Sequence, residues 1–195
     1  MVKKVIVLLA DGFEDVEAVT PIDYLHRAGI EVTTASISDS LTVTSKWGGI
    51  KMTANSTLDE VLKQGTTGYD AIILPGGMPG TANLAASKET SALIKEMAAN
   101  GKLVCAICAA PALVLAPLGL LKGKKFTCYP NMEEKVRATC CADGSNWSGD
   151  RVVTDGNFIT SRGAGTAGEF AVAIIEKLLD KAAAQKLAEK VLLLN

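Results

Sequence analysis

Short runs of apolar residues alternate, along most of the chain, with stretches whose apolar residues recur at helical spacing. The runs are rich in Val, Ile and Leu and do not alternate with polar residues, which is typical of strands buried on both faces of a sheet. The expected strands are Val5–Ala10, Ile30–Ser36, Ala71–Leu74 and Leu103–Ile107, with shorter ones near Lys125–Thr127, Arg151–Thr154 and Phe158–Thr160. The expected helices are 14–28, 58–63, 87–100, 109–118, 166–179 and 181–193, and the polar stretch 37–56 is a candidate hairpin with the glycine pair Gly48-Gly49.

This repeated strand–helix order predicts an α/β fold with a mostly parallel sheet and helices on both faces. A length of 195 residues suits one domain, and we expect residues 1–195 to form it. Sites in such sheets lie at the carboxyl ends of the strands. Four segments follow strands in this way: Asp11–Glu17, Pro75–Gly80, Cys105–Pro111 and Ser161–Thr166.

Composition narrows the class of protein further. Hydrophobic residues make up 48% of the chain and charged residues 21%, so a sizeable core is expected and disorder is not. The net charge of −1, without a basic patch, disfavours nucleic acid as a partner. The apolar run Val5–Ala10 is too short to span a bilayer and lacks the features of a signal peptide, so we expect no membrane association and a cytoplasmic location.

The cysteines disfavour both a disulfide framework and a metal site. There are five, Cys105, Cys108, Cys128, Cys140 and Cys141, an odd number in a chain that is not small. Cys105 and Cys108 have a spacing that zinc sites use, but no second pair at ligand spacing follows, and His26 is the only histidine. We therefore expect no structural metal.

Cys108 stands where an expected strand runs directly into an expected helix. Small residues flank it, Ala106 before and Ala109-Ala110 after, as glycines flank the serine of a nucleophile elbow. A cysteine at a helix N-terminus faces unpaired N–H groups that favour the thiolate, so we expect a lowered pKa. The N–H of Ala109 and one from Gly76-Gly77 are candidate oxyanion donors. Two alternatives compete with this reading: an inert buried cysteine, which describes Cys105 better, and a Cys-x-x-Cys redox pair, in which the first cysteine would begin the helix.

A thiolate needs a proton partner, and Glu17 suits this role better than His26. The two residues are nine positions apart on one expected helix, about half a turn out of phase, so His26 more plausibly interacts with the helix end. Glu17 lies on a largely apolar stripe, where burial would raise the pKa of its carboxyl and keep it protonated. Glu14 and Asp15 remain alternatives near the helix start.

These motifs resemble the ThiJ/PfpI superfamily, most closely its parkinsonism-associated deglycase and bacterial ThiJ-like branch. The resemblance rests on four stretches in order: 10–17 with Pro21-Ile22-Asp23, 74–77, 106–111 and 160–166. It implies a flavodoxin-like three-layer sandwich and a homodimer. It also implies Cys108 as the reactive, easily oxidised cysteine, Glu17 as its protonated partner, Gly77 and Ala109 as backbone donors, and Arg27 near the cysteine in the dimer.

The chain also departs from the family pattern. Tyr129 stands where close relatives often carry a histidine before the proline that matches Pro130, and Lys46 or Gly48 stands near the position of a second family arginine. Ala109 follows Cys108, where the protease-like branch has histidine, which disfavours a peptidase.

The resemblance therefore implies a cofactor-independent glyoxalase or deglycase. Its substrate would be methylglyoxal or the adducts that this aldehyde forms on proteins or nucleotides, and Glu17 would move the protons. The alternative is a redox sensor or chaperone whose Cys108 is oxidised to sulfinate. The sequence assigns no role to Cys128, Cys140 or Cys141.

Overall fold

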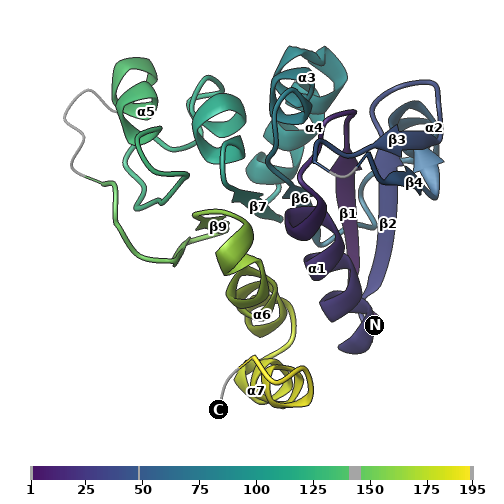
Figure 1. Ribbon diagram of the computed structural model, residues 1–195, viewed down its shortest axis with the longest axis vertical. Helices are drawn as coiled ribbons and strands as arrows, with labels where there is room; N and C mark the ends of the chain where they lie inside the picture. The colour runs from purple at the N-terminus through teal and green to yellow at the C-terminus, as the bar shows by residue number, and fades with distance from the viewer. Residues whose placement is uncertain (1, 48, 141–145, 194–195) are drawn as a thin grey trace.

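A seven-stranded sheet forms the centre of the molecule in the computed structural model, which describes residues 2–47, 49–140 and 146–193 (Figure 1). Its strands are β1 (Lys4–Leu9), β2 (Glu31–Ser36), β5 (Ser56–Thr57), β6 (Ala71–Leu74), β7 (Leu103–Ile107), β8 (Val152–Asp155) and β9 (Phe158–Ser161). Their order is β5-β2-β1-β6-β7-β9-β8, and every neighbouring pair is parallel except β8 and β9. Every residue of β6 and β7 is buried, as their unbroken apolar runs predicted.

Helices cover both faces of this sheet and create two separate cores. The helices are α1 (Asp15–Arg27), α2 (Leu58–Gln64), α3 (Gly80–Ala86), α4 (Lys88–Ala99), α5 (Glu133–Thr139), α6 (Ala167–Leu178) and α7 (Lys181–Lys190). Side chains from α1, α6 and α7 pack in one core with alternate residues of the central strands, whereas α2, α3, α4 and α5 contribute to the other (Figure 1). This arrangement confirms the three-layer, flavodoxin-like α/β fold.

The expected hairpin is present and leans over the end of β1. Its strands β3 (Thr42–Thr44) and β4 (Lys51–Thr53) are antiparallel; Gly48, one of the two glycines of the expected pair, lies outside the described residues. Gly12 N–H donates to the Thr44 carbonyl over 2.8 Å, and Thr44 N–H donates to Asp11 Oδ1 over 2.8 Å. These contacts fix the hairpin above the segment that follows β1.

The prediction of a strand at Lys125–Thr127 was wrong. The N–H groups of Lys125 and Thr127 donate to side-chain oxygens, Asp155 Oδ2 over 2.8 Å and Thr160 Oγ1 over 2.9 Å, instead of to the backbone of a neighbouring strand. The segment makes only an isolated bridge between Phe126 and Trp147.

Helix predictions also failed at three places. The helix expected at 109–118 is a turn followed by a single π-helical segment, Pro111–Leu115. Two short helices were missed. One is α3, which begins directly after Pro79 in a stretch that resembled a loop, and the other is α5, which lies in a polar region.

The direction in which successive strands are added reverses between β1 and β6. After β1 the chain moves to β2 on one side and later to β6 on the other, which is the topological switch point of a flavodoxin-like sheet. The carboxyl ends of β1, β6, β7 and β9 lie along one edge of the sheet there. Among the described residues, no helix is both long and apolar enough to cross a membrane.

Candidate functional site

Cys108 occupies a strained turn directly after β7. Its φ of +64° is in the left-handed region that few residues other than glycine adopt. The backbone is held on both sides, because Cys108 N–H donates to the Ser161 carbonyl over 2.9 Å and Tyr129 N–H donates to the Cys108 carbonyl over 2.8 Å. The following Ala109 and Ala110 are buried. This geometry agrees with the elbow that the flanking small residues predicted.

The glycine pair after β6 lets a second backbone segment approach the sulfur. A Cβ atom on Gly76 would lie 2.6 Å from Cys108 Cβ and 3.0 Å from Sγ, so only glycine fits there. Gly77 has a φ of +92°, and a Cβ on it would lie 2.6 Å from the Gly12 carbonyl oxygen. Backbone N–H groups of Gly77 and Ala109 donate hydrogen bonds to the Cys108 sulfur.

Glu17 points from the first turn of α1 to the same place. The residue is 1% exposed, and its carboxyl group shares a hydrogen bond with the Cys108 thiol. Gly76 N–H donates to Glu17 Oε2 over 2.9 Å, and Ala164 N–H also donates to this carboxyl group. Sequence analysis proposed Gly76 as an oxyanion donor, but the Gly76 N–H donates to the Glu17 carboxyl group instead. The N–H groups that donate to the sulfur are those of Gly77 and Ala109.

The pair holds its protons more tightly than isolated groups do. Burial, together with the nearby Glu14 carboxylate, raises the pKa of Glu17 from 4.5 to about 7. The pKa of the Cys108 thiol is also raised, first by burial and then by the neighbouring Glu17. We expected a lowered pKa from the helix N-terminus. The N–H groups of Ala109 and Gly77 do act in that direction, but burial and Glu17 outweigh them. The two groups therefore titrate as a pair, and the first proton leaves near neutral pH.

A cavity of about 590 Å³ opens above this pair. Its volume is in the range that holds a whole small molecule rather than a few atoms. The lining residues come from the start of α1, the segments that follow β3, β6, β7 and β9, and the loop 129–132: Glu14, Glu17, Lys46, Trp47, Gly77, Met78, Cys108, Ala109, Tyr129, Pro130, Asn131, Met132 and Ala164. Tyr129 lies in this wall and is 52% exposed.

Sequence reasoning missed several residues of the cavity wall. Trp47 is 72% exposed and carries the Lys46 ammonium 4.4 Å from its ring centroid. Its only sequence signal was a bulky aromatic residue in an otherwise polar segment. Met78 and Met132 carried no signal in the sequence, because each lies in a loop whose apolar residues follow no helix or strand period.

Other sequence candidates lie away from the cavity. Arg27 is at the far end of α1, where its Nε donates to Asp23 Oδ2 over 2.7 Å, so its expected role near the cysteine depends on a second copy of the chain. His26 is exposed and does not line the cavity. Cys105 and Cys128 are fully buried free thiols, Cys140 is half-buried, and Cys141 lies outside the described residues.

Comparison with known proteins identifies the family and supports the fold. The DJ-1/PfpI family matches residues 3–177. The chain is similar to protein DJ-1 homolog B of Arabidopsis thaliana, with 43% identity over 92% of this chain but only 39% of that longer protein. It is also similar to the deglycase TK1284 of Thermococcus kodakarensis, with 34% identity over 83% of this chain and 91% of the relative. The solved structure of oxidised Toxoplasma gondii DJ-1 superposes with a TM-score of 0.89 at 38% identity, covering 97% of this chain and 98% of that one.

The raised pKa of Glu17 predicts a specific dependence of stability on pH. The folded protein binds this proton more tightly than the unfolded chain, so the stabilisation is complete below pH 4.5 and is lost as pH rises through 7. The full loss corresponds to about 3 kcal/mol in the free energy of unfolding. Urea titrations between pH 4 and 9 should show this decline in the wild type and a flatter profile in Glu17→Gln. Parallel profiles for the two proteins would contradict the assignment.

Proposed function

The chain belongs to the DJ-1/PfpI family, and from that premise we propose that it is a cysteine-dependent glyoxalase or deglycase. The proposed substrate is methylglyoxal or an adduct of this aldehyde on a protein or nucleotide. One observation carries the proposal: a buried carboxyl with a pKa of about 7 shares a hydrogen bond with a cysteine at a nucleophile elbow. A group with this pKa can both give and take a proton at neutral pH.

The chemistry begins with attack of the Cys108 sulfur on the aldehyde carbon. The S–H proton passes to the Glu17 carboxylate as the C–S bond forms, the carbonyl electrons move to oxygen, and the proton now held by Glu17 neutralises that oxygen to give a hemithioacetal. The N–H groups of Gly77 and Ala109, which already donate to the sulfur, are close enough to stabilise the developing oxyanion.

Glu17, now a carboxylate, then moves a second proton. It takes the hydrogen from the carbon bonded to sulfur and returns it to the neighbouring carbon, while the hemithioacetal hydroxyl proton passes to the former ketone oxygen. The former ketone thereby becomes an alcohol and a lactoyl thioester forms. Water cleaves the thioester and releases lactate and the thiol. The net reaction adds one water to methylglyoxal and consumes no other reactant.

The size of the cavity supports adducts as substrates beside the free aldehyde. A volume of about 590 Å³ is far larger than a three-carbon molecule needs. Trp47, Met78 and Tyr129 form an exposed apolar rim on which the carrier of an adduct can rest. A reducing, cytoplasmic location is part of the proposal, because such chemistry needs Cys108 as a thiol.

We expect Cys108→Ser to abolish lactate production from methylglyoxal. Glu17→Gln should lower it by about 10²–10⁴-fold, because the amide cannot exchange protons. The matched control is Cys105→Ala, which changes a buried cysteine of the same strand and should keep most of the turnover. An enzymatic lactate assay measures all four proteins. Absence of turnover in the wild type would refute the enzyme, and full turnover in Cys108→Ser would refute the site.

A second candidate function, redox sensing, is supported by the same hydrogen bonds. A carboxyl that stays protonated near pH 7 can donate to a sulfinate oxygen, and Gly77 and Ala109 offer two further donors. The relative from Toxoplasma gondii was solved in an oxidised form. Oxidation of the thiolate to sulfinate adds two oxygen atoms and reduces two peroxide molecules to water.

Mild peroxide should therefore add two oxygen atoms to Cys108 in the wild type. In Glu17→Gln the sulfinate should give way to further oxidation or to the unmodified thiol, because the carboxyl donor is gone. Peptide mass spectrometry distinguishes these products, and the buried Cys105 in the same digest serves as the internal control. Equal sulfinate yields in both proteins would argue against a role for Glu17 in oxidation.

We also propose that the chain forms a homodimer through the outer face of α1. Val16 and Val19 are 45% and 48% exposed, and Arg27 lies within about 20° of Val16 around the helix axis. Two exposed valines and an arginine on one face of a helix are typical of a surface that another chain covers. Such contact would bring Arg27 toward the cavity of the partner, which is the role expected from the sequence.

The double variant Val16→Glu/Val19→Glu should sediment as a monomer at concentrations at which the wild type sediments as a dimer. Facing copies of the new carboxylates would repel each other across the interface. Val2→Glu, an exposed valine outside α1, is the matched control and should leave the dimer intact. A monomeric wild type, or a double variant that still dimerises, would refute this surface.

A further inference from the structure

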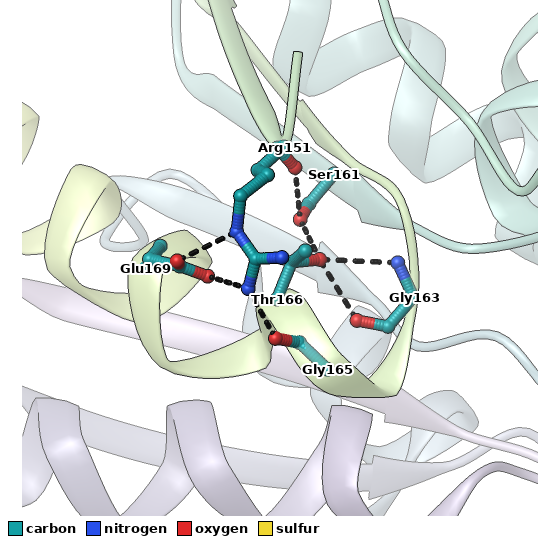
Figure 2. Close-up of polar contacts among 6 residues, drawn as sticks. All are labelled: Arg151, Ser161, Gly163, Gly165, Thr166 and Glu169. Atoms are coloured by element: carbon teal, nitrogen blue, oxygen red, sulfur yellow. Dashed lines mark hydrogen bonds and ion pairs between the residues drawn. The ribbon is translucent and has the colours of Figure 1, made fainter. Parts of the chain in front are cut away.

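A compact hydrogen-bond network shapes the segment after β9, here named the 161–166 turn and defined as residues Ser161 to Thr166. The hydroxyl of Thr166 donates to the Gly163 carbonyl over 2.8 Å and accepts the Gly163 N–H over 3.1 Å (Figure 2). The Ser161 hydroxyl oxygen lies 2.6 Å from that of Thr166 and 2.9 Å from the Arg151 carbonyl oxygen, and either of these can accept its single proton. Ser161 and Thr166 are both buried, so these bonds are shielded from water.

The side chain of Arg151 bonds to the solvent-facing side of the 161–166 turn and to α6. Its guanidinium makes a two-pronged contact with Glu169 on α6, at 2.7 Å from Nε and 2.9 Å from Nη2 (Figure 2). The same Nη2 donates to the Gly165 carbonyl over 2.5 Å. Arg151 therefore connects the turn both to α6 and, through its own carbonyl, to the strand end at Ser161.

This turn contacts both members of the Cys108–Glu17 pair. The Ser161 carbonyl accepts the Cys108 N–H over 2.9 Å, which helps to hold the strained φ of the cysteine. Ala164 N–H donates to the Glu17 carboxyl group. A Cβ on the buried Gly163 would lie 3.7 Å from Glu17 Oε1, so the turn packs directly against the carboxyl.

We propose that Thr166, Arg151 and Glu169 are positioning residues that hold the 161–166 turn against Cys108 and Glu17. Thr166 sets the internal shape of the turn, and the Arg151–Glu169 contact fixes its outer side. None of the three touches the cavity, so they act through Ser161 and Ala164. The inference rests on the Cys108–Glu17 pair of the proposed function, but it concerns how that pair is held and not what it turns over.

A change in this turn can be observed through the pair because few other groups face Glu17. Glu14 lies beside it on α1, Cys108 follows β7, and Lys46 and Tyr129 line the same cavity. The variants below alter none of these four. The Ala164 N–H favours the ionised carboxylate, so its loss raises the pKa of Glu17 further.

The test is the midpoint of the Glu17 carboxyl titration, followed by the ¹³C chemical shift of that carboxyl group, which is assigned by its absence in Glu17→Gln. In Thr166→Val, which keeps the shape but removes the hydroxyl, the midpoint should move up by about 0.5–1 pH unit. Thr166→Ser keeps the hydroxyl and should restore the wild-type midpoint. A site that merely loosened and admitted water would move the midpoint down, because burial is the largest cause of the raised pKa. A downward shift or no shift therefore overturns the proposal.

The ion pair provides a second variant that leaves the buried network intact. Glu169→Gln should move the midpoint in the same direction by a smaller amount, since Arg151 keeps its bond to Gly165. Asp59→Asn removes an exposed ion pair with Lys63 on α2, far in sequence from the turn, and should leave the midpoint unchanged. Equal midpoints for Glu169→Gln and Asp59→Asn would exclude Arg151 and Glu169 from the proposal. Because this titration needs no turnover, a missing lactate signal would refute the proposed function while leaving this result to stand.

Discussion

The burial of one carboxyl group beside one thiol is the constraint on which the rest of the site depends. An isolated ionised carboxylate is costly to remove from water, so Glu17 can remain 1% exposed only with donors around it or with its proton in place. Both conditions are met in part. The N–H groups of Gly76 and Ala164 donate hydrogen bonds to the carboxyl group, and desolvation keeps the pKa of Glu17 near 7. The donors come from the ends of two different strands, which the parallel sheet brings to one edge.

Cys108 illustrates how the sheet maintains a strained conformation. A non-glycine residue with positive φ costs on the order of 1–3 kcal/mol and persists only where its surroundings determine it. Here β7 is paired on both sides, with β6 and with β9, and the Cys108 peptide groups bond to Ser161 and Tyr129. The strain aims the sulfur at the Gly77 and Ala109 N–H groups instead of into the core, where Cys105 lies.

The sequence predicted the elements of this site because each has a local signal. Unbroken apolar runs identified β1, β6 and β7, and the strand-end rule then selected the segments that contain Glu17, Gly76 and Cys108. The protonation of Cys108 was predicted less well, because a helix N-terminus is visible in the sequence whereas burial beside a carboxylate is a property of the tertiary fold. Trp47 and Tyr129 were not predicted as walls of one cavity, since they come from separate loops that only the packed structure brings together. The same reason explains why Lys125–Thr127 was taken for a strand: the sequence does not reveal that its N–H groups bond to the side chains of Asp155 and Thr160.

The Cys108–Glu17 pair can support two reactions because an oxyanion on carbon and an oxyanion on sulfur are stabilised by the same hydrogen-bond donors. An oxygen that develops on the attacked aldehyde and an oxygen added to the sulfur both lie near the Gly77 and Ala109 N–H groups. The demands on Glu17 differ. Turnover requires it to lose and regain its proton within each cycle, whereas a stored sulfinate requires it to keep that proton. With a pKa near 7, Glu17 can do either at neutral pH. The balance between turnover and oxidation therefore depends on how strongly the surrounding backbone N–H groups stabilise the Glu17 carboxylate. Each N–H group that donates to Glu17 therefore affects the balance between turnover and oxidation, because it stabilises the carboxylate. The Ala164 N–H is one of these groups, and it lies on the turn that Thr166 and Arg151 shape.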